Sequence, residues 1–144
     1  MKKVIIKIIG VCVLTALTCC SKKSDPTPQE DPVPNWSITQ TNPDYTSSMT
    51  LIMAMPESFT VTPTDCMAVF SGDECVGLAK NPVETPNGYR FFLYIIKPLD
   101  PSLFLDLKMY SFNLKRMFTI ERYCKYWIDD AYGTIEEPLI FEPK

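Results

Sequence analysis

The chain of 144 residues contains no histidine. Histidine is the usual general base of Ser-His-Asp and Cys-His catalysis and a frequent zinc ligand, so these sites are excluded. Glycine is scarce too, with five residues and no glycine-rich phosphate loop. The cysteines include no C-x-x-C pair of the kind that binds zinc. We therefore expect no catalytic residue, no metal site and no cofactor.

Basic charge is not in excess, since 14 lysines and arginines stand against 17 acidic residues. A chain without a basic surplus is a poor partner for nucleic acid, whose binding depends on releasing counterions from phosphates. Hydrophobic residues make up 46% of the chain and aromatic residues 12%. This composition is sufficient for one well-packed domain.

No apolar run is long enough to span a bilayer, but the N-terminus has the pattern of an export signal. A basic start, M-K-K-V-I-I-K, precedes a short apolar stretch at 8–17. The following L-T-C-C resembles a bacterial lipobox with Leu17 three positions before the modified cysteine. Residues 1–19 are therefore predicted to be a lipoprotein signal peptide and Cys20 the lipidated residue, with Cys19 as the alternative. The acyl chains added to this cysteine would anchor the protein to a membrane.

Residues 20–35 are rich in proline and charge, and Val33 is their only large apolar side chain. Such a segment cannot bury a core and is predicted to be an extended tether with a reach of about 40 Å. The expected location is the cell envelope, lipid-anchored at the outer membrane. The run S-K-K-S-D lacks a strongly acidic surface-export cluster. The sequence therefore does not decide whether the domain is displayed on the periplasmic or the surface-exposed leaflet.

From residue 36 onward, short apolar segments are separated by proline, glycine and asparagine. Alternating or aromatic-rich runs predict strands at 49–55, 89–96, 103–110, 117–120, 123–128 and 139–141. Gly72-Asp73 and Asn87-Gly88 are typical of tight hairpin turns. No long window has a helical stripe. Residues 36–144 are therefore predicted to form one all-β domain, an antiparallel β-sandwich of about seven or eight strands, Ig-like or jelly-roll-like.

Several of these segments resemble a β-sandwich module of Bacteroidota surface lipoproteins and type IX secreted proteins. The resemblance lies in D-C-M-A-V-F-S-G-D-E-C-V-G-L-A at 65–79, with weaker matches at 45–50, 107–110 and 133–139. One position departs from the module, because Val76 stands where arginine is common. The resemblance implies the fold and an envelope location, but no particular ligand or reaction.

Three cysteines fall in the predicted domain. With Gly72-Asp73 as the turn, Phe70 faces Cys75, and Cys66 lies about 13 Å further along the same strand. A disulfide needs Cα atoms about 4.4–6.8 Å apart, so Cys66 and Cys75 are not expected to pair. Two alternatives remain: a disulfide between Cys75 and Cys124, or three buried small hydrophobic residues.

The function predicted from these features is a non-catalytic binding module on the envelope, for a glycan or a protein partner. Four aromatic residues are candidates for ligand contact: Trp36, Tyr45, Tyr126 and Trp127. One alternative is a small hydrolase using two carboxylates, although adjacent acidic residues on a strand point to opposite faces. The other is a structural subunit of a surface complex.

Overall fold

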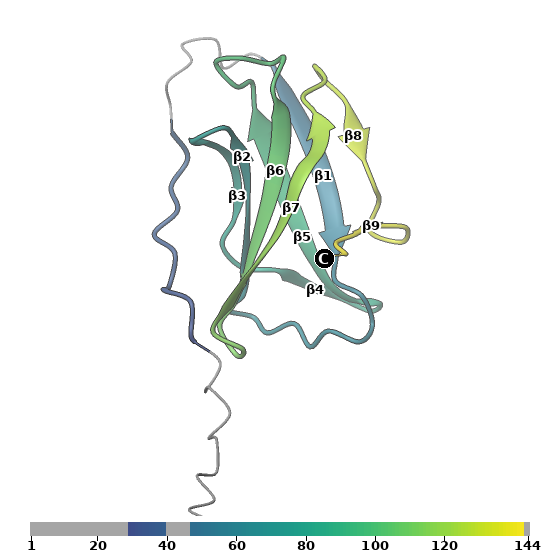
Figure 1. Cartoon of the computed structure of the whole chain (residues 1–144). Helices are drawn as coiled ribbons and strands as arrows, with labels where there is room; N and C mark the ends of the chain where they lie inside the picture. Colours follow the sequence, from purple (N-terminus) through teal and green to yellow (C-terminus); the bar gives the residue numbers. More distant parts are fainter. Residues whose placement is uncertain (1–28, 40–46, 143–144) are drawn as a thin grey trace, which may run out of the picture.

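The computed structural model describes residues 29–39 and 47–142, which form nine strands and no helix (Figure 1). The strands are β1 (Ser48–Ala54), β2 (Cys66–Ser71), β3 (Glu74–Ala79), β4 (Val83–Thr85), β5 (Gly88–Ile96), β6 (Phe104–Ser111), β7 (Arg116–Lys125), β8 (Ala131–Tyr132) and β9 (Leu139–Ile140). Across this described part there is thus no helix able to cross a membrane.

The strands belong to one curled sheet in the order β7-β6-β2-β3-β5-β1-β8, with β4 added to β5 and β9 to β1. Most neighbours are antiparallel, but β8 and β9 both pair with β1 in parallel. The all-β prediction is confirmed. The prediction of a purely antiparallel sheet is wrong, because after β7 the chain crosses to β1 and runs beside it in the same direction. A two-layer sandwich is not confirmed; the sheet curls into a half-barrel.

The core fills the concave side of this curled sheet. Every second side chain of a strand points to the same face, and the three longest central strands each contribute three fully buried residues. These are Met49, Leu51 and Met53 of β1, Phe91, Leu93 and Ile95 of β5, and Leu105, Leu107 and Met109 of β6. Because one sheet wraps around its own apolar face, no second layer is needed to cover that face.

The β2–β3 hairpin has the predicted turn at Gly72-Asp73, with Ser71 opposite Glu74 and Phe70 opposite Cys75. Beyond that pair the register shifts, so that Val69 lies opposite Gly77. This β-bulge adds one residue to β3 and turns Val76 into the core, where it is fully buried. A side chain of arginine would not be accommodated there, which explains the apolar residue in this chain.

Three sequence predictions differ in detail from the structure. The segment at 117–120 and the first three residues of the segment at 123–128 belong to one strand, β7, which bends where Arg122 adopts a positive φ of 52°. Trp127 lies beyond its end. In the β4–β5 hairpin Thr85 pairs with Gly88, so the turn residues are Pro86 and Asn87, one position earlier than predicted.

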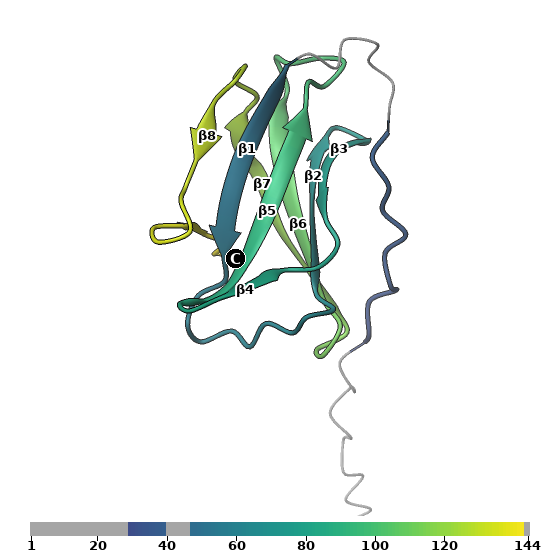
Figure 2. The ribbon, with the colours of Figure 1, turned by 180° about the vertical axis from the view of Figure 1, so that it is seen from behind.

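Residues 29–39 run along the convex side of the sheet, beside β2 and β3 (Figures 1 and 2). Near one end the Thr39 amide donates a 2.8 Å hydrogen bond to the Cys75 carbonyl, and near the other the Asp31 amide donates a 2.9 Å bond to the Lys115 carbonyl. Contacts of the folded body therefore extend upstream of residue 36, into the part of the predicted tether that the structure describes.

Candidate functional site

The four aromatic residues predicted from the sequence have different environments. Trp36 is half-buried on the convex face, and Trp127 is 57% exposed beyond the end of β7. Tyr126 is only 5% exposed and belongs to the core cluster, so it is not available to a ligand. Tyr45 lies outside the described residues. The candidates therefore do not form one site, and two of them mark separate clefts.

The first cleft, called the Trp36 cleft below, has a volume of about 410 Å³. Residues 34–36 of the N-terminal segment form one wall. The other walls come from the start of β2, the end of β3 and the residue that follows β6. It is lined by Pro34, Asn35, Trp36, Thr64, Cys66, Leu78, Lys80, Asn81 and Phe112. This size is within the range of small-molecule sites, and the lining combines aromatic rings with amide, hydroxyl and ammonium groups.

Contacts on the convex face hold the Trp36 ring in place. It meets the Phe70 ring edge-to-face, with centroids 5.9 Å apart and planes at 70°. The Lys108 ammonium group lies 4.5 Å from the centroid of the same Phe70 ring. Side chains alternate between the two faces of a strand. Val69 and Leu107 point into the core, so their neighbours Phe70 and Lys108 face outward. The convex face of the sheet thus supports the Trp36 ring through Phe70.

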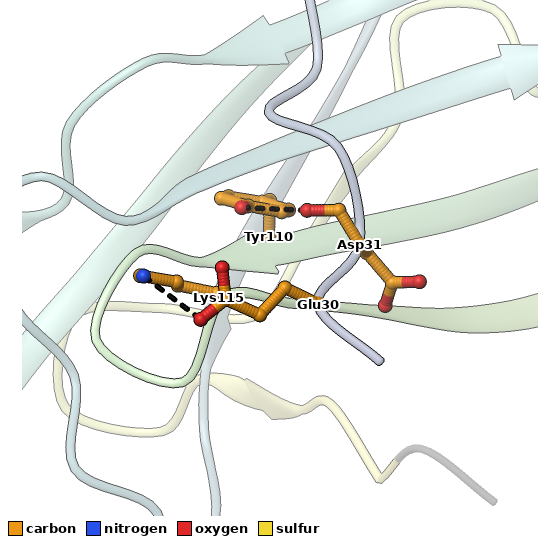
Figure 3. Close-up of polar contacts among 4 residues, drawn as sticks. All are labelled: Glu30, Asp31, Tyr110 and Lys115. Carbon is orange, nitrogen blue, oxygen red and sulfur yellow. Dashed lines mark hydrogen bonds and ion pairs between the residues drawn. The ribbon is translucent and has the colours of Figure 1, made fainter. Parts of the chain in front are cut away.

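The Asp31 contacts fix the chain five residues before Trp36 (Figure 3). The Tyr110 hydroxyl donates to the Asp31 carbonyl oxygen at 3.1 Å, and the Met117 amide donates to the Asp31 carboxylate at 2.8 Å. Together with the Thr39 bond, these contacts bracket Trp36 on both sides. The wall of the cleft is therefore held by hydrogen bonds as well as by ring packing.

Asp65 organises the loop at the base of the Trp36 cleft. Its carboxylate is fully buried and accepts hydrogen bonds from the amides of Thr62 and Phe112, both at 2.8 Å. These bonds join the loop before β2 to the residue after β6, and so place Thr64 and Phe112 in the lining. Oriented with its amide nitrogen toward the backbone, Asn81 donates to the carbonyls of Lys80 and Pro63 at 2.9 and 3.3 Å.

The second cleft, the Trp127 cleft, is more apolar and has a volume of about 350 Å³. It lies where the curled sheet does not close, between β7 on one side and β1, β8 and β9 on the other. It is lined by Met49, Leu51, Tyr123, Cys124, Trp127, Tyr132 and Leu139. The aromatic rings provide contact area, but the Tyr132 hydroxyl already donates to Asp130 at 2.9 Å.

The three cysteines of the described domain are free thiols. Cys66 and Cys75 do not face each other in the β2–β3 hairpin, because Cys75 lies opposite Phe70. The alternative disulfide between Cys75 and Cys124 is not formed, because β3 and β7 are separated in the sheet by β2 and β6. Burial raises the pKa of Cys66 and Cys124 to about 11, helped at Cys66 by the negative charge of Asp65. Burial also raises the pKa of Cys75. These thiols are protonated at neutral pH and are poor nucleophiles.

The three pairs of adjacent acidic residues, Asp73-Glu74, Asp129-Asp130 and Glu136-Glu137, lie in or beside turns and bends. The Glu74 carboxylate accepts the Leu99 amide at 3.0 Å, and the Glu137 amide donates to the Thr134 hydroxyl at 2.9 Å. At Asp129 the backbone has a positive φ of 56°. Of the four clefts identified among the described residues, none has two carboxylates in its lining. The same residues contain no cluster of three or more potential metal ligands.

Most lining residues of the Trp36 cleft could not be recognised from the sequence. Leu78 is an ordinary residue of the predicted hairpin, and Phe112 falls just after the predicted strand at 103–110. Asn35 belongs to the predicted tether, and Lys80 and Asn81 fall outside the predicted strands. The only available signal was the tryptophan at the boundary between the proline-rich segment and the first strands. Comparison with protein-family models, curated proteins and solved structures finds no match to this chain. The predicted lipidation positions, Cys20 and Cys19, lie outside the described residues.

Proposed function

We propose that the protein is a lipid-anchored envelope protein whose β domain is a non-catalytic module for carbohydrate binding at the Trp36 cleft. The observation that supports this best is the composition of the lining. A half-buried indole and the Phe112 ring offer apolar surfaces to the C–H faces of a sugar, while Asn35, Thr64 and Asn81 offer partners for its hydroxyls. Lys80 contributes the only formal charge of the lining.

The first test is titration of the purified protein with a panel of bacterial and host polysaccharides, followed by calorimetry with the oligosaccharide of the best ligand. Trp36→Ala should weaken binding about tenfold or more, because a lost aromatic contact of about 1.4 kcal/mol corresponds to that ratio. Trp127→Ala is the matched control, since it removes an equally large ring at the other cleft. Equal urea midpoints for the variants would establish that the loss is local.

A protein partner at the Trp127 cleft is the second candidate function. It is favoured by the 57% exposure of Trp127 above an apolar cleft, since exposed tryptophans are common anchors of protein interfaces. The same two variants separate the candidates. Loss of binding in Trp127→Ala, with Trp36→Ala unaffected, would move the site to the second cleft, and an absence of polysaccharide binding by the native protein would contradict the proposal.

The anchor is tested by mass analysis of the protein purified from bacterial membranes. Cys20→Ala should abolish the diacylglycerol and acyl mass and release the protein into the soluble fraction, whereas Cys19→Ala should not. The reverse pattern would assign the modification to Cys19. An unmodified native protein would remove the lipid anchor from the proposal.

A further inference from the structure

The N-terminal segment begins beside the turn between β6 and β7. Asp31 is joined to this turn by three hydrogen bonds, from the Tyr110 hydroxyl, from the Met117 amide and to the Lys115 carbonyl. Figure 3 shows this junction, and Figure 1 shows that the described chain starts at the same end of the sheet as the turn. The described chain therefore begins at this end of the sheet, at Gln29.

The β6–β7 turn, at this end of the sheet, carries exposed apolar side chains. Leu114 at its tip is 49% exposed, and Phe112 is 38% exposed and meets the Tyr110 ring at a centroid distance of 5.0 Å. Val33, two residues beyond Asp31 in the docked segment, is 63% exposed. An apolar tip on a tight hairpin is a small projection that a membrane interface can accommodate.

The charges around the tip are balanced. The Lys115 ammonium group lies 2.8 Å from the Glu30 carboxylate, and the Arg116 guanidinium lies 5.9 Å from the centre of the Phe118 ring. Asp31 uses its carboxylate to accept the Met117 amide. Neither a strong positive nor a strong negative field surrounds Leu114, so contact with a bilayer would depend on apolar insertion and little on anionic lipid.

We propose that the β6–β7 turn, through Leu114 at its tip, rests in the interfacial layer of the bilayer that holds the lipid anchor. This inference rests on the proposed lipidation of Cys20. Gln29 lies nine positions after Cys20, a fully extended reach of about 30 Å and an average span nearer 17 Å for a flexible chain. A lipid on Cys20 would therefore keep the tip within contact distance of the membrane surface, and the docked segment would fix which end of the sheet faces it.

The loop between β5 and β6 is an internal control for apolar exposure. Its Leu99 is 68% exposed and Leu103 is 44% exposed, so both are as exposed as the residues of the tip. They lie at the opposite end of β6, an eight-residue strand and therefore about 26 Å away. If exposure alone decided membrane contact, the β5–β6 loop would be the better candidate. The β6–β7 end is selected instead because the described chain, which follows the proposed lipid anchor, begins there.

The experiment compares Leu114→Trp with Leu99→Trp in the full-length, lipid-modified protein. Each variant is reconstituted in phosphatidylethanolamine–phosphatidylglycerol vesicles with brominated acyl chains, which quench nearby indole fluorescence. The emission added by the new tryptophan, relative to the native protein, should be quenched at least about twofold more at position 114 than at position 99. The difference should persist at high salt, because apolar insertion is not screened.

Equal quenching at the two positions, or stronger quenching at position 99, would overturn the docked turn while leaving the lipid anchor intact. Absence of acyl mass on the protein would overturn both this inference and the proposed anchor. Matching urea midpoints for the two variants and the native protein would show that quenching reports position rather than unfolding, since both substitutions are at exposed sites.

Discussion

Asp65 shows how a single buried charge can serve structure alone. Its carboxylate is fully buried, yet both of its oxygens accept backbone amides from different loops. Charge-assisted bonds of this kind offset the cost of removing a carboxylate from water. Asp65 therefore joins the base of the Trp36 cleft to the β6–β7 end of the sheet, and no acid–base role is required to explain it.

The raised pKa values of Cys66 and Cys124 predict an alkaline loss of stability. Each thiol has a pKa of about 11 in the folded protein, against 9.0 when it is exposed. Below pH 9 both states are protonated and stability is unaffected; between about 9 and 11 the unfolded state releases protons first, so stability falls. We expect the free energy of unfolding to decline more steeply over this range in the native protein than in a Cys66→Ala/Cys124→Ala variant.

The measurement is urea denaturation at a series of pH values for both proteins. The variant is the control for tyrosine and lysine groups that titrate in the same range. Parallel curves for the two proteins would contradict the prediction. At pH 8 the folded thiols should also react with iodoacetamide about 100-fold more slowly than in urea, as two pKa units imply.

At the scale of elements, the β8–β9 connection depends on one glycine. Gly133 has a positive φ of 77°, and an added Cβ would collide with the Ile52 carbonyl oxygen and approach the Leu139 amide to 3.0 Å. The loop is also held by Arg90, which is 5% exposed and donates to the Ile135 carbonyl at 2.9 Å. Close packing on β1 is what allows the last strands to add to it in parallel.

Gly133→Ala should therefore lower the free energy of unfolding by about 3 kcal/mol, the sum of a left-handed backbone and a steric overlap. Gly72→Ala is the matched control. It also has a positive φ, of 58°, but its added Cβ would meet only the Leu103 Cδ1 atom at 3.9 Å. Its expected cost is about 1 kcal/mol. Equal urea midpoints for the two variants would contradict the importance of the β1 contact.

Elements were predicted with unequal success, and the reasons are physical. The β1, β5 and β6 segments were found because their alternation or aromatic content is a local property. The hairpin turn at Gly72-Asp73 was found because glycine tolerates a positive φ. The bulge at Val76 was missed, since the extra residue follows from how β3 packs on the core. The β8 strand was missed because two residues have no period. The β9 strand was predicted at 139–141, but its parallel pairing with β1 is a long-range contact that the local pattern does not specify.

At the scale of the whole molecule, the segment next to the predicted anchor is part of the folded body. Residues 29–39 contact β2, β3 and the β6–β7 turn, and they supply one wall of the Trp36 cleft. The proposed ligand site and the proposed membrane contact thus share one segment of chain. Its docking should set both the shape of the cleft and the direction in which the domain faces.

Asp31→Ala tests this docking. It removes the acceptor of the Met117 amide, so that amide should exchange with solvent faster and the free energy of unfolding should fall by about 1 kcal/mol. Glu30→Ala is the matched control, because it removes only an exposed ion pair with Lys115 and should change stability by less than about 0.5 kcal/mol. Amide exchange followed by NMR and urea denaturation are the measurements. Unchanged exchange at Met117 in Asp31→Ala would contradict the docking.

The sequence by itself determined the all-β class, the main strands and the hairpin register that separates Cys66 from Cys75. It also restricted the chemistry, because the absence of histidine is a property of composition. These features depend on local periodicity or on residue type. Only the tertiary structure decided that the sheet curls on itself with β8 and β9 parallel to β1, and that Tyr126 is buried while Trp127 is exposed. It alone brings Trp36 onto Phe70. Such contacts join residues far apart in the chain, and their formation depends on how the faces of the sheet are filled.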